Sequence, residues 1–155
     1  MSHALVVETC LMACTIGTWC VDTGATNHVC NSLQGFQKTR RLADGEICLW
    51  MGDTTKVAAV AVGVVSLHFS GGKILVLEEC LYVPSIRRNL ISVSCLSCNG
   101  FSALFNKNFV SIKYGADEIC LGMLVDNLYL IEPIAPMQIN SNESNHKRKE
   151  RSSIN

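Results

Sequence analysis

Apolar and polar residues alternate along much of the chain, and short turns rich in Gly, Asp and Asn interrupt the alternation. The first strand that this pattern predicts is Ile16–Val21, which runs directly into Asp22. A longer β-branched run, Val57–Phe69, predicts a strand that bends at Gly63. Residues 27–41 become polar and basic, which favours a surface connection. Short strands between regularly spaced turns are typical of an all-β barrel or sandwich.

One helix is predicted in this otherwise β chain. Leu90, Val93 and Leu96 recur at roughly helical spacing, so we expect a strand that leads into a short helix. Asn99-Gly100 would end that helix, because both residue types tolerate the left-handed conformation. The other predicted strands cover residues 46–51, 73–77, 80–83, 101–105, 109–114, 118–121 and 128–131.

These elements predict an all-β barrel with one short helix, followed by a small β extension. We divide the chain into an N-terminal tether (1–15), a β-barrel domain (16–100), a β extension (101–132) and a polar, basic tail (133–155). The tail is expected to be disordered, because its composition supplies little apolar surface to bury.

Composition narrows the function classes. The chain has 155 residues, of which 48% are hydrophobic and 17% charged, which predicts one domain with a packed core. Its net charge is zero, so electrostatics gives no reason to expect nucleic acid or membrane as the main partner. The longest apolar run, Val57–Val65, is too short to span a bilayer. The basic cluster His146–Lys149 could contact nucleic acid weakly or act as a nuclear signal, but a solvated linker is simpler.

The chain has nine cysteines, and most of them lie in apolar runs, where a thiol packs as a small hydrophobic group. The opening stretch Met1–Glu8 lacks the basic segment of a secretory signal. We therefore predict reduced thiols in an intracellular protein rather than a framework of disulfides.

The strongest chemical signal is Asp22-Thr23-Gly24, directly after the apolar Trp19–Val21. Burying a carboxylate costs roughly several kcal/mol unless the group is paired, hydrogen-bonded or protonated. An aspartic protease uses this arrangement, because two such carboxylates face each other and share a proton. Asp22 would be the acid or base, the Thr23 hydroxyl would hydrogen-bond across the loop, and Gly24 would allow a tight turn. For the tripeptide alone, an Asx-type turn at a strand end is the simpler interpretation.

A zinc site is a further hypothesis. Cys95 and Cys98 have the spacing of zinc ligands, and His28 and Cys30 could supply two more. The chain has only one Cys-x-x-Cys, however, and it lies in an apolar run. We therefore expect no metal and no cofactor, and we expect His28 to pack or hydrogen-bond near the Asp22 loop.

Five short blocks, in order along the chain, resemble the protease region of Pol polyproteins from Copia-type long-terminal-repeat retrotransposons of plants. They are Trp19–Val29, Met51–Thr54, Val62–Val65, Leu81–Pro84 and Asn89–Val93. Residues 122–131, ending in Asn127-Leu128-Tyr129-Leu130, resemble the opening of the pre-integrase segment that follows. The resemblance extends over residues 16–131, and the order of the blocks makes it more specific than any single block.

The resemblance implies a retropepsin-like β-barrel that cleaves its own Gag-Pol precursor, a polypeptide substrate. Asp22 would be the catalytic residue, with Thr23 and Gly24 in its loop. The segment Asn89–Val93 would pack beneath that loop. The expected location is cytoplasmic, in a virus-like particle, and the basic tail leaves a nuclear location open.

The resemblance also implies a flap, a hairpin that closes over the substrate. Gly52, Asp53 and Thr54 would lie near its tip. The family usually has Gly where this chain has Thr54, so the tip is expected to be stiffer. Ser92 likewise stands where other retropepsins have Gly, although Ser is usual in the Copia group.

The chain contains one Asp-Thr-Gly, so an active enzyme would be a homodimer with one Asp22 from each subunit. The alternative is a catalytically inactive domain of the same fold that serves in structure or interaction. Blocks typical of integrase are missing, and we expect a fragment, a processed product or a decayed copy.

Overall fold

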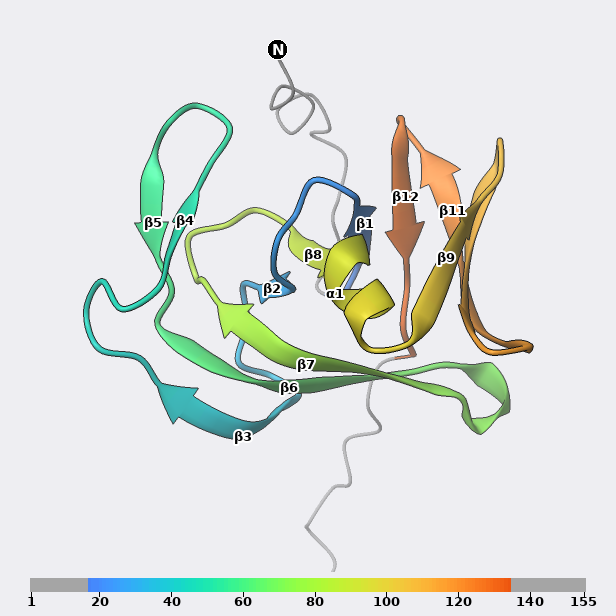
Figure 1. Ribbon diagram of the computed structural model, residues 1–155, viewed down its shortest axis with the longest axis horizontal. Helices are drawn as coiled ribbons and strands as arrows, with labels where there is room; N and C mark the ends of the chain where they lie inside the picture. The colour runs from blue at the N-terminus through green and yellow to red at the C-terminus, as the bar shows by residue number, and fades with distance from the viewer. Residues whose placement is uncertain (1–16, 135–155) are drawn as a thin grey trace, which may run out of the picture.

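The computed structural model of the protein describes residues 17–134, so the predicted tether at 1–15 and nearly all of the predicted tail lie outside the described residues. The described elements are β1 (Trp19–Asp22), β2 (Val29–Cys30), β3 (Phe36–Arg41), β4 (Cys48–Trp50), β5 (Lys56–Ala58), β6 (Ala61–His68), the 3-10 turn η1 (Ser70–Gly72), β7 (Ile74–Tyr82), β8 (Asn89–Ser92), α1 (Val93–Cys98), β9 (Phe101–Phe105), β10 (Phe109–Tyr114), β11 (Asp117–Val125) and β12 (Leu128–Ile131) (Figure 1).

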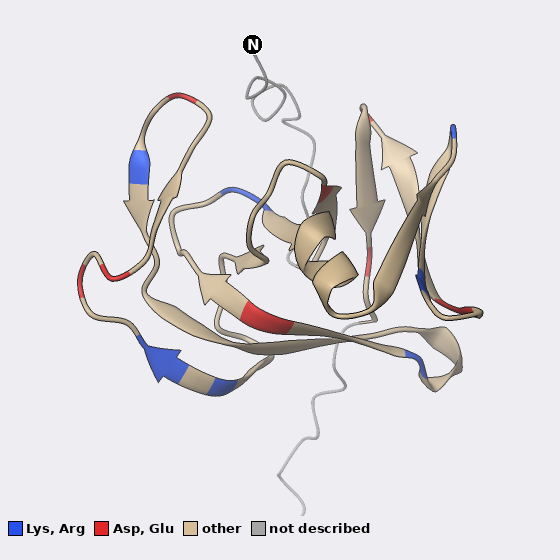
Figure 2. Ribbon diagram, in the orientation of Figure 1, with Lys and Arg blue, Asp and Glu red and all other residues tan. Residues whose placement is uncertain are grey.

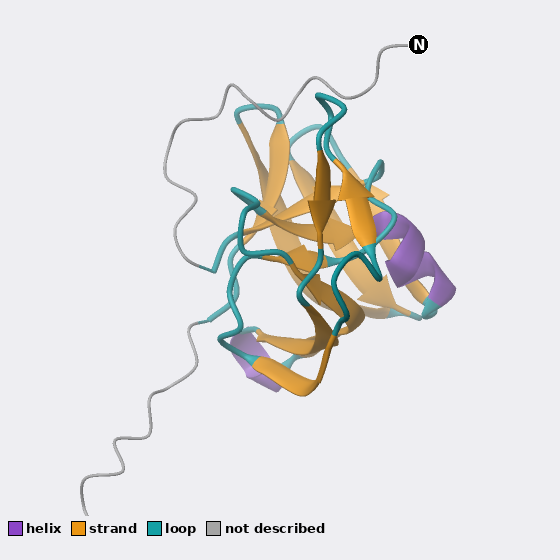
Figure 3. Ribbon diagram, turned by 90° about the vertical axis from the view of Figure 1, so that its left-hand side faces the viewer, coloured by secondary structure: helices purple, strands orange, loops and turns teal. Residues whose placement is uncertain are grey.

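Most strands form one large sheet in the order β3-β6-β7-β2-β8-β1-β12-β11-β10-β9, and β4 and β5 form a separate hairpin. The sheet bends around a core but does not close, because β3 and β9 remain as edges. The helix α1 lies at one side of the strands (Figure 3). The predicted all-β, barrel-like class with one short helix is confirmed, and the barrel is open.

Two apolar clusters hold the bent sheet together. The larger cluster lies between the β6–β7 part of the sheet and the β8–β12 part, and its fully buried members include Leu75, Leu77, Ile91, Ile112 and Ile131. Each such side chain contributes roughly 1.5–3 kcal/mol through burial. The smaller cluster comprises Val29, Leu42, Ala59, Leu81, Val83 and Ile86.

Strand β1 lies in the middle of the sheet and is paired on both sides. It runs parallel to β8 over all four of its residues and antiparallel to β12, with Trp19 opposite Ile131. The strands after α1 therefore continue the same sheet as the strands before it. The division of the chain at residue 100 stays a prediction.

The expectation of a surface connection over residues 27–41 is wrong, because this segment contains β2 and β3. Strand β3 is an edge strand that pairs only with β6, so its polar and basic side chains point to water. Figure 2 shows these basic residues along the strand. An irregular pairing between Gln37 and Arg40 further reduces the alternation that would identify a strand.

The predicted continuous strand Val57–Phe69 is also wrong in one respect, because it breaks at Ala59-Val60. The backbone N–H of Ala59 donates to Ile47 (2.9 Å), whereas that of Val60 donates to Tyr82 on β7 (2.9 Å). The chain changes partners between these two residues. The expected bend at Gly63 coincides with an irregular pairing of β6 and β7 between Gly63 and Val65.

Within residues 17–134, no helix is long and apolar enough to cross a membrane.

Candidate functional site

Asp22 is the last residue of β1 and is half-buried. Its neighbour across the parallel pair is Ser92, the last residue of β8. The backbone N–H of Gly24 donates to Oδ1 of Asp22 at 2.7 Å, which closes an Asx-type turn. This bond fixes one carboxylate oxygen and leaves the other without a role in the turn.

Thr23 and Gly24 are exposed next to that carboxylate. A Cβ on Gly24 would lie 3.3 Å from Oδ1 of Asp22, so any side chain at this position would crowd the carboxylate. The Thr23 hydroxyl makes no hydrogen bond to another described residue of the single chain. The turn therefore places the Asp22 carboxylate and the Thr23 hydroxyl side by side at the surface. Gly24 lets the backbone come close to the carboxylate.

The loop after Asp22 is held by the junction of β8 and α1. The hydroxyl of Ser92, which is completely buried, donates to the carbonyl oxygen of Ala25 at 2.6 Å. The hydroxyl oxygen of Ser92 also accepts from the backbone N–H of Cys95 at 3.2 Å and so caps the helix. The thiol of Cys95 donates to the carbonyl oxygen of Thr26 at 3.2 Å.

His28 closes the far end of the loop and is 1% exposed. Its Nδ1 accepts a hydrogen bond from the backbone N–H of Ser92 at 3.0 Å. The expectation that His28 packs or hydrogen-bonds near the Asp22 loop is confirmed. Its Nε2 has no partner among the described residues, and burial lowers the pKa of the imidazole from 6.5 to about 4. At neutral pH the ring is therefore uncharged, with its proton on Nε2.

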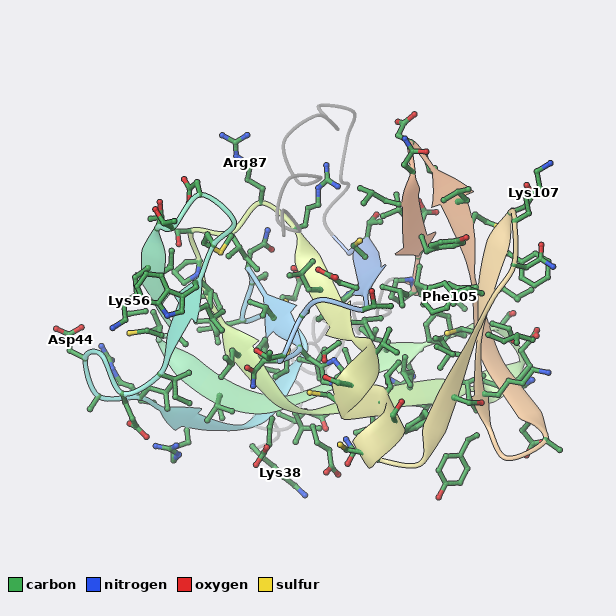
Figure 4. All side chains as sticks on the ribbon, turned by 45° about the horizontal axis from the view of Figure 1, so that its top comes forward. Lys38, Asp44, Lys56, Arg87, Phe105 and Lys107 are labelled. Atoms are coloured by element: carbon green, nitrogen blue, oxygen red, sulfur yellow. The ribbon has the colours of Figure 1, made fainter. Side chains whose placement is uncertain are left out.

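Gly52, Asp53 and Thr54 form the exposed tip of the β4–β5 hairpin. Hydrogen bonds from Thr55, first from its side chain and then from its backbone N–H at 3.0 Å, lower the pKa of the Asp53 carboxyl group. Thr54 has a left-handed backbone, with φ of 70°. Lys56 lies on the outside of the hairpin (Figure 4), 5.7 Å from the centre of the Trp50 ring.

The structure does not bring this hairpin tip to the Asp22 loop within one chain. The hairpin stands at the left edge of Figure 1, whereas the loop between β1 and β2 lies near the centre. A cleft of about 460 Å³ lies elsewhere, beyond the start of β1, where Thr18, Ser66 and Glu132 contribute to its lining. Asp22 does not line that cleft.

Three of the four residues of the zinc hypothesis make other hydrogen bonds, among them Cys30, whose thiol donates to the carbonyl oxygen of Ser32 at 3.2 Å. His28 Nδ1 and the Cys95 thiol make the hydrogen bonds described above, and Cys98 is exposed on the last turn of α1. In the described part of the chain, no three His, Cys, Asp or Glu residues are grouped so that they could hold a metal ion.

Sequence reasoning missed the contacts that Ser92 makes with this loop. One signal was present, since Ser directly before a short helix is a preferred N-cap. The pairing with Ala25 had no local signal, because 67 positions separate the two residues.

Comparison with known proteins gives a family match over the same region. A family model described as the beta-barrel domain of Pol polyproteins matches residues 19–101. The chain is also 29% identical over 111 residues to the retrovirus-related Pol polyprotein from transposon TNT 1-94 of tobacco, Nicotiana tabacum. That alignment covers 72% of this chain and 8% of the relative, so the chain spans a small part of the curated protein. No solved structure matches the chain.

Proposed function

Because the chain belongs to the beta-barrel domain family of Copia-type Pol polyproteins, as its motifs predict, we propose that it is an aspartic-type endopeptidase. It would act as a homodimer and cleave a polypeptide, the Gag-Pol precursor that contains it. The observation that carries the proposal is the geometry of Asp22. A carboxylate at the end of a central strand is half-buried, fixed by the Gly24 N–H through one oxygen, and flanked by the exposed Thr23.

The chemistry needs a second carboxylate, which a second copy of the chain would supply about a twofold axis. Two carboxylates at contact distance cannot both ionise cheaply, so the pair would hold one proton. The ionised Asp22 would accept a proton from a water molecule as it attacks the scissile carbonyl carbon. The protonated Asp22 would donate to the carbonyl oxygen.

The β4–β5 hairpin supports the proposal as a flap. Its exposed tip is formed by Gly52, Asp53 and Thr54, and it is the one hairpin outside the large sheet among the described residues. An extended peptide could pair with backbone groups of such a hairpin. The tip would have to move toward the Asp22 loop, or reach substrate that the dimer holds between the subunits.

The test is cleavage of a precursor-like polypeptide at mildly acidic pH by the chain and by Asp22→Asn. We expect cleavage by the first and none by the second, with equal thermal unfolding of both. Asp44→Asn is a matched control, because Asp44 is an exposed turn residue away from the loop (Figure 4), and it should cleave normally. Retained cleavage by a folded Asp22→Asn variant would refute the assignment.

The alternative is a catalytically inactive β-barrel module of the Pol polyprotein. The separation of the hairpin tip from the Asp22 loop in the single chain favours this alternative. No cleavage by the folded, dimeric chain would support it.

A further inference from the structure

The buried hydroxyl of Ser92 both donates and accepts hydrogen bonds. Its single proton goes to the Ala25 carbonyl, and its oxygen accepts from the backbone N–H of Cys95. The Ser94 hydroxyl lies 3.0 Å from the Ser92 hydroxyl and 3.5 Å from the Ala25 carbonyl oxygen, so its one proton goes to either of them, and Ser92 makes the shorter bond to Ala25. Because the Ser92 side chain is buried from water, its hydroxyl cannot rotate without breaking the bond to the Ala25 carbonyl.

His28 supplies the second link, to the backbone of the same residue. Its Nδ1 takes the place that a main-chain carbonyl would fill as acceptor for the Ser92 N–H. Both ends of segment 22–28 are thereby fixed on Ser92, since Asp22 pairs with it across the strands and His28 bonds to it.

We propose that Ser92 and His28 are positioning residues that fix the orientation of the Asp22 carboxylate; the inference deepens the proposed function and rests on it. The carboxylate is oriented by the Gly24 N–H, and Gly24 is followed directly by Ala25, whose carbonyl Ser92 holds. A shift of the Ala25 carbonyl therefore moves the group that orients Asp22. Displacement of a reacting group by about 1 Å can cost about a hundredfold in rate.

Neither residue touches the reacting atoms in this arrangement, so the effect is on orientation. Ser92 therefore has a role that Gly at the same position could not fill, because Gly has no hydroxyl to hold Ala25.

The test measures hydrogen exchange of the Gly24 amide by NMR in the full chain and in four variants. Ser92→Ala removes the hydroxyl, His28→Leu removes the acceptor, and His28→Asn keeps an acceptor at a similar position. Ser97→Ala is the control, because Ser97 is exposed on the same helix. We expect exchange to rise about tenfold in Ser92→Ala and His28→Leu, less in His28→Asn, and not at all in the control.

Cleavage kinetics give the second readout. In an active protein, Ser92→Ala and His28→Leu should lower kcat about tenfold or more and leave KM within about twofold, because binding surfaces are intact. His28→Asn should recover most of the kcat.

The two proposals fail in different ways. A folded, dimeric wild-type chain that does not cleave refutes the endopeptidase, and Gly24 exchange still decides whether Ser92 and His28 hold the carboxylate. Gly24 exchange that stays within about twofold in both variants overturns the positioning role. The positioning role is also overturned if core amides, such as those of Ile91 and Ile112, lose protection from exchange to the same extent as the Gly24 amide. Should Ser92→Ala fail to fold, the pair His28→Leu and His28→Asn decides by the same measurement.

Discussion

Asp22 and Ser92 are direct neighbours at the ends of two parallel strands, and the loop that begins at Asp22 returns to Ser92 through His28. Parallel strands bring their carboxyl ends to one edge of a sheet, so this pairing places the carboxylate, its turn and the start of α1 together. The arrangement links a general feature of β structure to the proposed chemistry. The strand pair carries the reactive carboxylate at its end, and the loop supplies the Gly24 N–H that orients this carboxylate.

If the enzyme is a homodimer with one Asp22 per subunit, an inactive subunit should suppress an active one. Mixing wild-type chain with an equal amount of Asp22→Asn chain, under conditions that allow exchange, should reduce the activity per wild-type chain to about half. The reason is that random pairing places half of the wild-type chains in mixed dimers that lack one carboxylate. An excess of Asp44→Asn chain, in contrast, should leave the activity unchanged when it is divided by the total amount of both chains, because both chains are expected to be active. Activity that is indifferent to added Asp22→Asn chain would rule out a shared site.

The buried His28 should make stability depend on pH. Burial lowers its pKa to about 4 in the folded protein, whereas the unfolded chain has the ordinary value of 6.5. Between these pH values the unfolded state binds more protons than the folded state. The titration of His28 therefore leaves the free energy of unfolding unchanged above pH 6.5 and decreases it as the pH falls toward 4. The loss reaches about 2 kcal/mol at pH 5. Urea unfolding of the chain and of His28→Asn at pH 7 and pH 5 measures it.

Both proteins contain the same Asp and Glu residues, so the contribution of these residues to the pH dependence of stability cancels in the comparison. His28→Asn should therefore lose less stability on acidification than the wild-type chain. Equal losses in the two proteins would contradict the assignment of the effect to His28.

The sequence predicted those parts of the fold and site that depend on local signals. The alternation of side chains identifies most strands, and Asp22-Thr23-Gly24 together with the ordered blocks identifies the family. The sequence pattern did not identify β3, because an edge strand needs no apolar alternation. The pattern also did not locate the break at Ala59-Val60. That break arises from hydrogen bonds to Ile47 and Tyr82, and such long-range partners leave no local pattern in the chain.

Thr54 at the hairpin tip has a backbone conformation that favours glycine. Its φ of 70° is strained for a β-branched residue, so Thr54→Gly should raise the free energy of unfolding by about 0.5–1 kcal/mol. Thermal unfolding measures the change. Thr55→Gly is the matched control, because Thr55 lacks the left-handed backbone and should lose stability when replaced. Equal destabilisation by the two substitutions would show that the tip carries no such strain.

Gly122 on β11 is a position where the surrounding atoms leave no room for a side chain. A Cβ there would lie 2.8 Å from Cγ1 of both Ile131 and Val110, and 3.0 Å from the carbonyl oxygen of Leu130. Real Cβ contacts are not this short, so the sheet or the two side chains must shift. Gly122→Ala should therefore destabilise the protein by about 1–3 kcal/mol in chemical denaturation.

The crowding at Gly122 can be separated from a general effect of Ala in a strand. Ser102→Ala, at an exposed position of β9, should change stability by less than about 0.5 kcal/mol. Val110→Ala destabilises by leaving a cavity, but in the same chain as Gly122→Ala it also provides room for the new methyl group. The double variant should therefore lose less stability than the two single losses added together, since the substituted groups are in contact. Full additivity would mean that the contact with Val110 does not account for the glycine, and that Ile131 and the backbone of Leu130 do.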